Sequence, residues 1–174
     1  MSIWQSLPEF GTGVLYAILM AAAYTFAVAI ASSSGRPRLL QAARLGAFGT
    51  VSLVGLSVLV LAFAFVSHDF RISYVARYSD RTMSTPYLMA ALWGGQDGSL
   101  LWWLLLTSGF SAGCIAWLRR RYIELQPYVI ATLMTIIGFF SLLMIFAANP
   151  FATNAGGAPL DGSGLNYQLR NFYM

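Results

Sequence analysis

The chain of 174 residues contains no lysine, one cysteine and one histidine, and only 9% of its residues are charged. A single cysteine, Cys114, cannot form an intrachain disulfide or a dithiol redox pair, and it is expected to be a small packing residue. A single histidine, His68, is a poor basis for a metal or haem site. These scarcities argue against thiol redox chemistry and against a histidine-based metal site within this chain.

Catalytic motifs are also missing from the sequence. It contains no nucleophile beside a base, no phosphate-binding glycine loop and no pair of carboxylates at helical spacing. Taken by itself, the chain is therefore not recognisable as an enzyme.

Long apolar runs dominate what is present. Hydrophobic residues make up 58% of the chain and the mean hydropathy is +0.67, which is typical of an integral membrane protein. A helix needs about 20 apolar residues to cross a bilayer. The lone glycines in the runs and the lack of polar alternation favour helices over barrel strands. The sequence predicts an all-α membrane protein, a single module over 1–174, with four transmembrane helices at about 12–32, 46–66, 99–118 and 128–148.

The first run is expected to be a retained span and not a signal peptide, because no basic residue precedes it.

The arginines predict the orientation, since short loops kept on the inner side collect basic residues. The two loops expected inside carry net +5 and the opposite side carries net −1, which accounts for the chain's +4. The basic pI near 9.5 thus reflects topology and gives no reason to expect nucleic-acid binding. Both termini, the 67–98 loop and the 149–174 tail are predicted to face outward. The inner arginines are Arg36, Arg38, Arg44, Arg119, Arg120 and Arg121.

The outer loop is predicted to contain a short helix before span three. Ser84 is a plausible N-cap, Pro86 suits the first turn, and 87–93 is apolar but too short to span a membrane. We expect this helix to lie at the outer membrane interface. Arginines 71, 77 and 81 in the same loop are nearly matched by aspartates, which favours local salt bridges over the alternative, binding of a ligand's carboxylates.

A glycine-broken segment then joins the short helix to span three, and we call residues 93–103 the tryptophan joint. Gly94 and Gly95 are predicted to end the short helix in a left-handed cap, and Asp97 or Ser99 to cap the next helix. One interpretation is an aromatic belt at headgroup depth. The other is that bare backbone and indole rings receive a flat, partly apolar ligand. The candidate binding residues are Trp93, Gly94, Gly95, Gln96, Asp97, Trp102 and Trp103.

The spans themselves contain no ionisable residue, which disfavours a transporter or channel. Gly109 and Gly113 form a Gly-x-x-x-Gly pair, which predicts close helix packing and places span three at the centre of the bundle.

Several motifs, in order, resemble those of the CcmF/NrfE-type cytochrome c haem lyases. The segment from Ala91 to Leu101, ALWGGQDGSLL, is similar to the tryptophan-glycine-glycine joint of that family. Pro8-Glu9-x-Gly11 resembles the family's N-terminus, and Asn149-Pro150-Phe151 its turn after the fourth helix. Asp161-Gly162-x-Gly164-Leu165-Asn166 resembles the segment that leads to its haem-handling region.

The resemblance implies a role in haem delivery and covalent haem attachment to apocytochrome c on the outer face of a bacterial inner membrane. Haem is the implied cofactor, and the implied partners are the remainder of the lyase, a haem chaperone and apocytochrome c. In that family a His-Pro-Pro segment and a tryptophan-rich haem-contact region follow, and this sequence stops before both. We therefore expect an N-terminal module whose haem ligands lie elsewhere. The alternative is a structural or scaffolding membrane subunit, or a fragment, without haem chemistry of its own.

Overall fold

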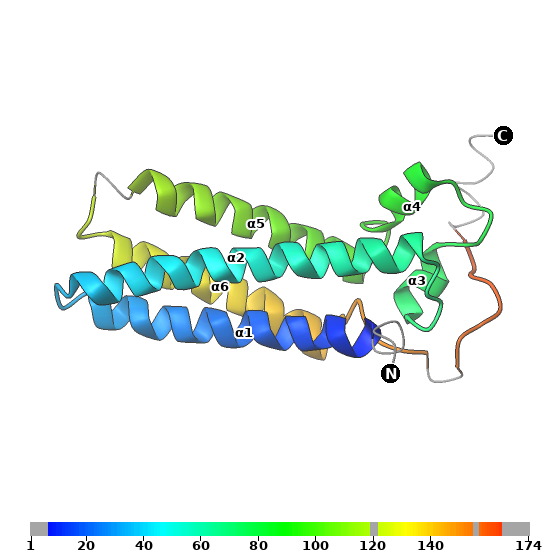
Figure 1. Cartoon of the computed structure of the whole chain (residues 1–174), viewed down its shortest axis with the longest axis horizontal. Helices are drawn as coiled ribbons and strands as arrows, with labels where there is room; N and C mark the ends of the chain where they lie inside the picture. Colours follow the sequence, from blue (N-terminus) through cyan, green and yellow to red (C-terminus); the bar gives the residue numbers. More distant parts are fainter. Residues whose placement is uncertain (1–6, 119–121, 155–156, 165–174) are drawn as a thin grey trace.

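The computed structural model describes residues 7–118, 122–154 and 157–164, and within them it is all-helical (Figure 1). Four helices are long and apolar enough to cross a membrane, which confirms the predicted class and the number of candidate spans. Two short helices lie between the second and third of them. In chain order the helices are α1 (Leu7–Ser32), α2 (Pro37–Val66), α3 (Ser73–Tyr78), α4 (Thr85–Ala91), α5 (Gln96–Leu118) and α6 (Gln126–Phe146).

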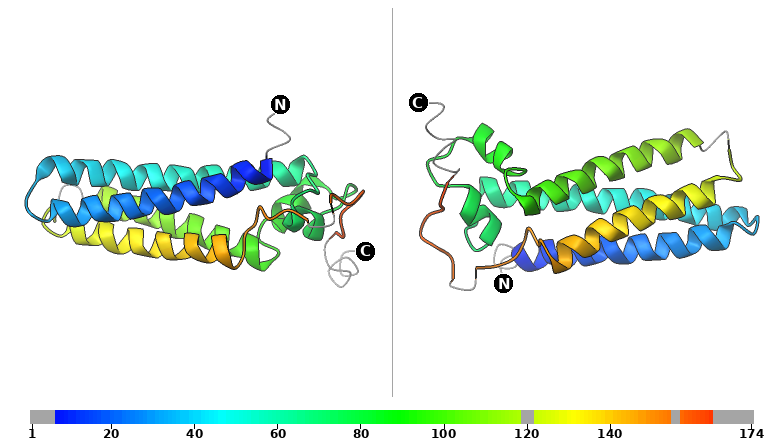
Figure 2. Two further views of the ribbon diagram at one scale, coloured as in Figure 1. Left: turned by 90° about the horizontal axis from the view of Figure 1, so that it is seen from below. Right: turned by 180° about the vertical axis from the view of Figure 1, so that it is seen from behind.

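The long helices form a bundle in which α1 packs along both α2 and α6, and α5 lies along α2 and α6 at the side (Figures 1 and 2). The most apolar window of α5 is 28% buried, the smallest share among the four long helices. The prediction that span three is the buried, central helix is therefore wrong.

The expected close packing at the Gly-x-x-x-Gly pair is also wrong within this chain. A Cβ built on Gly109 or Gly113 meets no atom within 4 Å, so both glycines face open space. Helices α1 and α2 approach closely at Gly46, where a Cβ would overlap Thr25 Oγ1, and small residues allow such an approach. Buried alanines on these two helices include Ala22, Ala29, Ala43 and Ala47, all at most 1% exposed.

One end of the bundle is tied by a polar cluster. The helix α2 begins at Pro37, well before the predicted span near residue 46, so Arg44 lies within it. Arg44 Nε donates a hydrogen bond to Oε1 of Gln126, the first residue of α6, over 2.7 Å. Gln126 Nε2 in turn donates to the carbonyl of Leu118, the last residue of α5. A buried amide thus links three helix ends, which satisfies polar groups that would otherwise be costly to bury.

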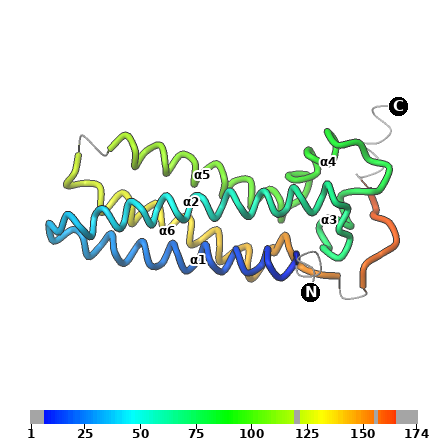
Figure 3. Tube along the Cα trace, in the orientation of Figure 1, coloured from blue at the N-terminus to red at the C-terminus, as the bar shows by residue number. Residues whose placement is uncertain are grey.

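The other end carries α3, α4 and the segment after α6, and α1 begins there as well (Figures 1 and 3). Ser73 N–H donates to the Ala152 carbonyl over 2.8 Å, and Ile72 forms an isolated β-bridge with Thr153. The segment after α6 is thereby held against α3. That this end faces outward and that α4 rests at the membrane interface stay predictions. Arginines 119–121 and the 165–174 tail lie outside the described residues.

Two motifs that are far apart in the sequence meet at this end. Phe151, from the Asn-Pro-Phe turn, is 1% exposed and packs against Gly11, from the Pro-Glu-x-Gly start. Asn149 Oδ1 accepts the Phe151 N–H over 2.9 Å, and Asn149 Nδ2 donates to Thr12 Oγ1 over 3.4 Å. A Cβ on Gly11 would overlap the Phe151 ring, so the close approach requires glycine.

This contact predicts different outcomes for two glycines on α1. We expect Gly11→Ala to lower the free energy of unfolding by about 1–3 kcal/mol, because the new methyl group overpacks the Phe151 ring. Gly13→Ala is the matched control, since a Cβ there meets nothing within 4 Å. It should be neutral or stabilising by up to about 1 kcal/mol through helix propensity. Unfolding of detergent-solubilised protein measures both, and equal effects would contradict the assigned contact.

Candidate functional site

The tryptophan joint connects two helices through a very short turn. The helix α4 ends at Ala91, and α5 begins at Gln96. Between them, Trp93 N–H donates to the Ala90 carbonyl over 3.3 Å and Gly94 N–H to the Ala91 carbonyl over 3.1 Å. These i→i−3 bonds form the short turn between the two helices.

The expected glycine cap is wrong. Among the described residues, positive φ occurs at Gly35, Gly157, Gly164 and His68, so neither Gly94 nor Gly95 is left-handed. The turn bonds end α4 before the glycines are reached. The predicted capping role of Ser99 is wrong as well, because α5 already begins at Gln96 and the Ser99 hydroxyl donates backward to the Trp93 carbonyl over 2.9 Å.

The glycines of the joint are needed instead for close contact with two tyrosines of α3. A Cβ on Gly95 would overlap the ring of Tyr78. A Cβ on Gly98 would overlap both the Leu92 carbonyl oxygen and the Tyr74 hydroxyl. The backbone of the joint therefore lies directly on α3, where only glycine fits.

Tyr74 is the residue that organises the joint, and no sequence motif singled it out. It is 1% exposed. Its hydroxyl lies 3.1 Å from the Ala91 carbonyl and 3.3 Å from the Leu92 carbonyl, as donor, and accepts the Gly95 N–H over 3.0 Å. Its ring packs edge-on against Phe65. Burial raises the pKa of the Tyr74 phenol to about 12, so the hydroxyl keeps its proton at neutral pH.

Two of the three predicted tryptophans come together on this scaffold. The rings of Trp93 and Trp102 lie 5.3 Å apart at 39°, and they are 47% and 38% exposed. Trp103 is 60% exposed, and as the next residue along α5 it projects about 100° further round the helix. Gln96 is exposed and Asp97 is half-buried in the first turn of α5. The joint therefore presents one paired indole surface with exposed Gly94 and Gln96 nearby in the chain.

The three arginines of the outer loop make different contacts, and one of them forms the predicted salt bridge. Arg71 forms a local ion pair with Asp69, with Nε to Oδ1 at 2.7 Å, as the salt-bridge interpretation predicts. Arg81 lies over the Phe70 ring at 5.9 Å, and its backbone N–H donates to Asp161 Oδ1. Arg77 donates to Ser73 Oγ over 3.1 Å.

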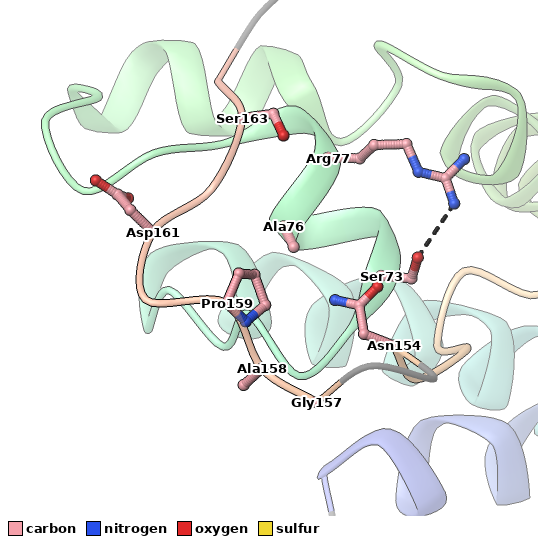
Figure 4. A pocket seen from close by; sticks show the side chains of 9 residues that line it. All are labelled: Ser73, Ala76, Arg77, Asn154, Gly157, Ala158, Pro159, Asp161 and Ser163. Atoms are coloured by element: carbon pink, nitrogen blue, oxygen red, sulfur yellow. Dashed lines mark hydrogen bonds between the residues drawn. The ribbon is translucent and has the colours of Figure 1, made fainter.

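Arg77 borders a cavity of about 370 Å³ between α3 and the segment after α6 (Figure 4). Asn154 and Asp161 line its other side. The Asp-Gly-x-Gly motif closes over α3, with Ser163 N–H donating to the Ala76 carbonyl over 2.8 Å. A Cβ on Gly162 would overlap the Ser79 carbonyl oxygen. The motif's first glycine is thus another site of close backbone contact with α3.

The His68 side chain does not expose its Nε2 atom to a ligand. It follows the end of α2 in a left-handed conformation, with φ at 50°. Its Nε2 atom is buried and has no hydrogen-bond partner among the described residues, and its ring packs edge-on against Phe70. An iron outside the protein surface could not reach this nitrogen without movement of the His68 loop.

Comparison with known proteins bears on what this arrangement does. No family model matches the chain. It is 32% identical over 170 residues to the cytochrome c-type biogenesis protein CcmF of Escherichia coli K12, covering 95% of this chain and 26% of that protein. It is 31% identical over 169 residues to the cytochrome c-type biogenesis protein NrfE of Haemophilus influenzae, with the same two coverages. The resemblance to CcmF and NrfE is confirmed.

A solved structure agrees with the sequence comparison. The cytochrome c haem lyase CcmF superposes with a TM-score of 0.67 and 25% identity, covering 83% of this chain and 24% of that one. The chain therefore shares the helical fold of part of CcmF. It spans about a quarter of the length of these relatives.

The Tyr74 hydroxyl generates a direct test of how the joint is held. We expect Tyr74→Phe to lower the free energy of unfolding by about 1–3 kcal/mol, because the Gly95 N–H loses its buried acceptor. Tyrosine 78, which packs on the same backbone, provides the matched control as Tyr78→Phe. Thermal unfolding followed by tryptophan fluorescence reports both stability and the indole environment. If the two variants behave alike, the Tyr74 hydrogen bonds do not hold the joint.

Proposed function

We propose that the chain is a module of a cytochrome c maturation protein and that its tryptophan joint forms one wall of a haem-handling surface. The observation that carries the proposal is the exposed Trp93–Trp102 pair, fixed on a buried scaffold in a chain similar to CcmF over 95% of its length. Indole faces are suited to stacking on a flat, largely apolar macrocycle. A rigid support lowers the entropic cost of binding such a ligand.

The residues present fit a contact wall and do not supply the haem ligands. The chain has one histidine, and its Nε2 is buried. In the described part of the chain, no cluster of three or more His, Cys, Asp or Glu side chains could hold a metal ion. The axial ligands of haem would therefore come from another part of the lyase, and this chain would orient the ring edge and exclude water from it.

The position of α5 supports a partner of this kind. Its Gly109 and Gly113 face open space, and Trp102 of the joint lies on the same helix. A transmembrane helix from the remainder of the lyase could approach the α5 backbone closely over these glycines. Such a helix would come to lie beside the paired indoles.

The arginine distribution and the similarity to CcmF and NrfE support an orientation of the bundle in the membrane. The α3–α4 end faces the outside of a bacterial inner membrane, where haem is received from a haem chaperone and attached to apocytochrome c. The opposite end, with its arginine-rich turns, faces inward.

A scaffolding role without haem contact is the second candidate, and one observation favours it. The contacts of Gly95 and Gly98 with the α3 tyrosines explain these glycines without any ligand. In that case the joint would be a structural turn, and the exposed tryptophans would serve as membrane-interface anchors.

Substitutions in the complete lyase separate the two candidates. We expect Trp93→Ala and Gln96→Ala to lower the yield of mature cytochrome c severalfold at normal lyase abundance, because they remove side chains exposed at the joint. Trp117→Ala, at the far end of α5, is the control. Unchanged yield in both joint variants would remove haem contact from the proposal and leave the scaffold.

The isolated chain should not hold haem tightly. Expressed alone and purified with haem available, it is expected to show no stoichiometric Soret absorbance, since the joint supplies contact area without iron ligands. Absorption spectra of the protein before and after haem addition measure this. A stoichiometric complex with a bis-histidine spectrum would contradict the assignment of the ligands to another part of the lyase.

A further inference from the structure

Arg36 lines two cavities beside the turn between α1 and α2, and Arg38 lines one of them. This turn lies at the end of the bundle opposite α3 and α4 (Figure 1). The larger cavity has a volume of about 510 Å³, and it opens between the turn after α1 and the start of α6. A second cavity of about 480 Å³ adjoins it on the α2 side and shares Arg36 with it. Together they surround the turn that carries Arg36 and Arg38.

The guanidinium groups of both arginines are accessible to an anionic ligand. Each is exposed, and among the described residues neither forms a salt bridge. Glu124 is the one acidic side chain that lines the larger cavity, and it too is exposed. The local balance is therefore positive, and a planar guanidinium binds phosphate oxygens in a two-pronged geometry.

Apart from two serines, the side chains that line the rest of the larger cavity are mostly apolar. Leu40 is buried on its floor, and Leu125 and Tyr128 at the start of α6 are 53% and 57% exposed. Ile123, also 57% exposed, lies beside them. A soluble anion would meet only the arginines, whereas an amphiphile would cover both halves of this surface.

The position of the cavity along the candidate membrane spans indicates which class of amphiphile it binds. The arginines lie at the start of α2, and Tyr128 lies in the first turn of α6, both of which are candidate membrane spans. Lipid phosphates lie at this level of a bilayer, and basic pockets between transmembrane helices bind anionic head groups.

We propose that this cavity is a binding site for an anionic glycerophospholipid. The phosphodiester lies between the Arg36 and Arg38 guanidiniums, and an acyl chain runs over Leu125 and Tyr128 along the lipid-facing side of α6. The site is separate from the tryptophan joint and does not depend on haem chemistry.

Lipid retention measured by native mass spectrometry tests the proposal on the full chain in non-ionic detergent. The probes are phosphatidylglycerol and phosphatidylcholine with identical acyl chains. We expect the chain to retain phosphatidylglycerol about 25-fold better, since each of the two arginines contributes about fivefold near an anionic lipid. We expect the double variant R36Q/R38Q to lose this preference. The control R77Q/R81Q removes the same charge from exposed positions at the other end and should keep the preference.

Three results would overturn the proposal. The first is equal retention of the two lipids by the unaltered chain. The second is an unchanged preference in R36Q/R38Q when circular dichroism and gel filtration show that the variant is folded. The third is displacement of phosphatidylglycerol by inorganic phosphate at equal concentration, which would show that the acyl-chain contacts add nothing to binding.

Discussion

The Tyr74 hydroxyl lies where α3, the end of α4 and the first turn of α5 meet. It is shared among the Ala91 and Leu92 carbonyls and the Gly95 N–H, and the ring beneath it is fully buried against Phe65 of α2. A polar group in that position is stable only when it is hydrogen-bonded. The constraint therefore fixes the turn between α4 and α5, and it requires that Gly98 carry no side chain. The ring of Tyr78 imposes the same requirement on Gly95.

The exposed indole pair follows from this constraint. The backbone at 92–98 is held against α3, which brings Trp93 and Trp102 together, with ring centroids 5.3 Å apart. The same end is closed from the other side by Phe151 on Gly11 and by the Ser163–Ala76 hydrogen bond. Rigid support of exposed aromatics is what a binding wall for a flat ligand requires.

The sequence predicted the helical class, the four long apolar helices and the place of the joint, because long uncharged runs and a Ser-Thr-Pro start are local signals. It failed where the outcome depended on which helix face meets which neighbour. Gly109 and Gly113 have the spacing of closely packed helices, yet the close approach lies between α1 and α2, where Gly46 packs against Thr25. Gly94 and Gly95 resembled a helix cap, whereas the constraint at Gly95 comes from the ring of Tyr78, on another helix. The local sequence pattern does not show which residues of other helices these glycines contact.

Hydrogen exchange on the complete lyase, with and without bound haem, tests the central claim most directly. If the tryptophan joint forms a wall of the haem-handling surface, backbone amides in the 93–103 peptide should exchange more slowly when haem is bound. The inner-end turn around residues 33–38 should exchange at the same rate in both states. Identical exchange of the 93–103 peptide with and without haem would contradict the account and leave the joint as a structural turn.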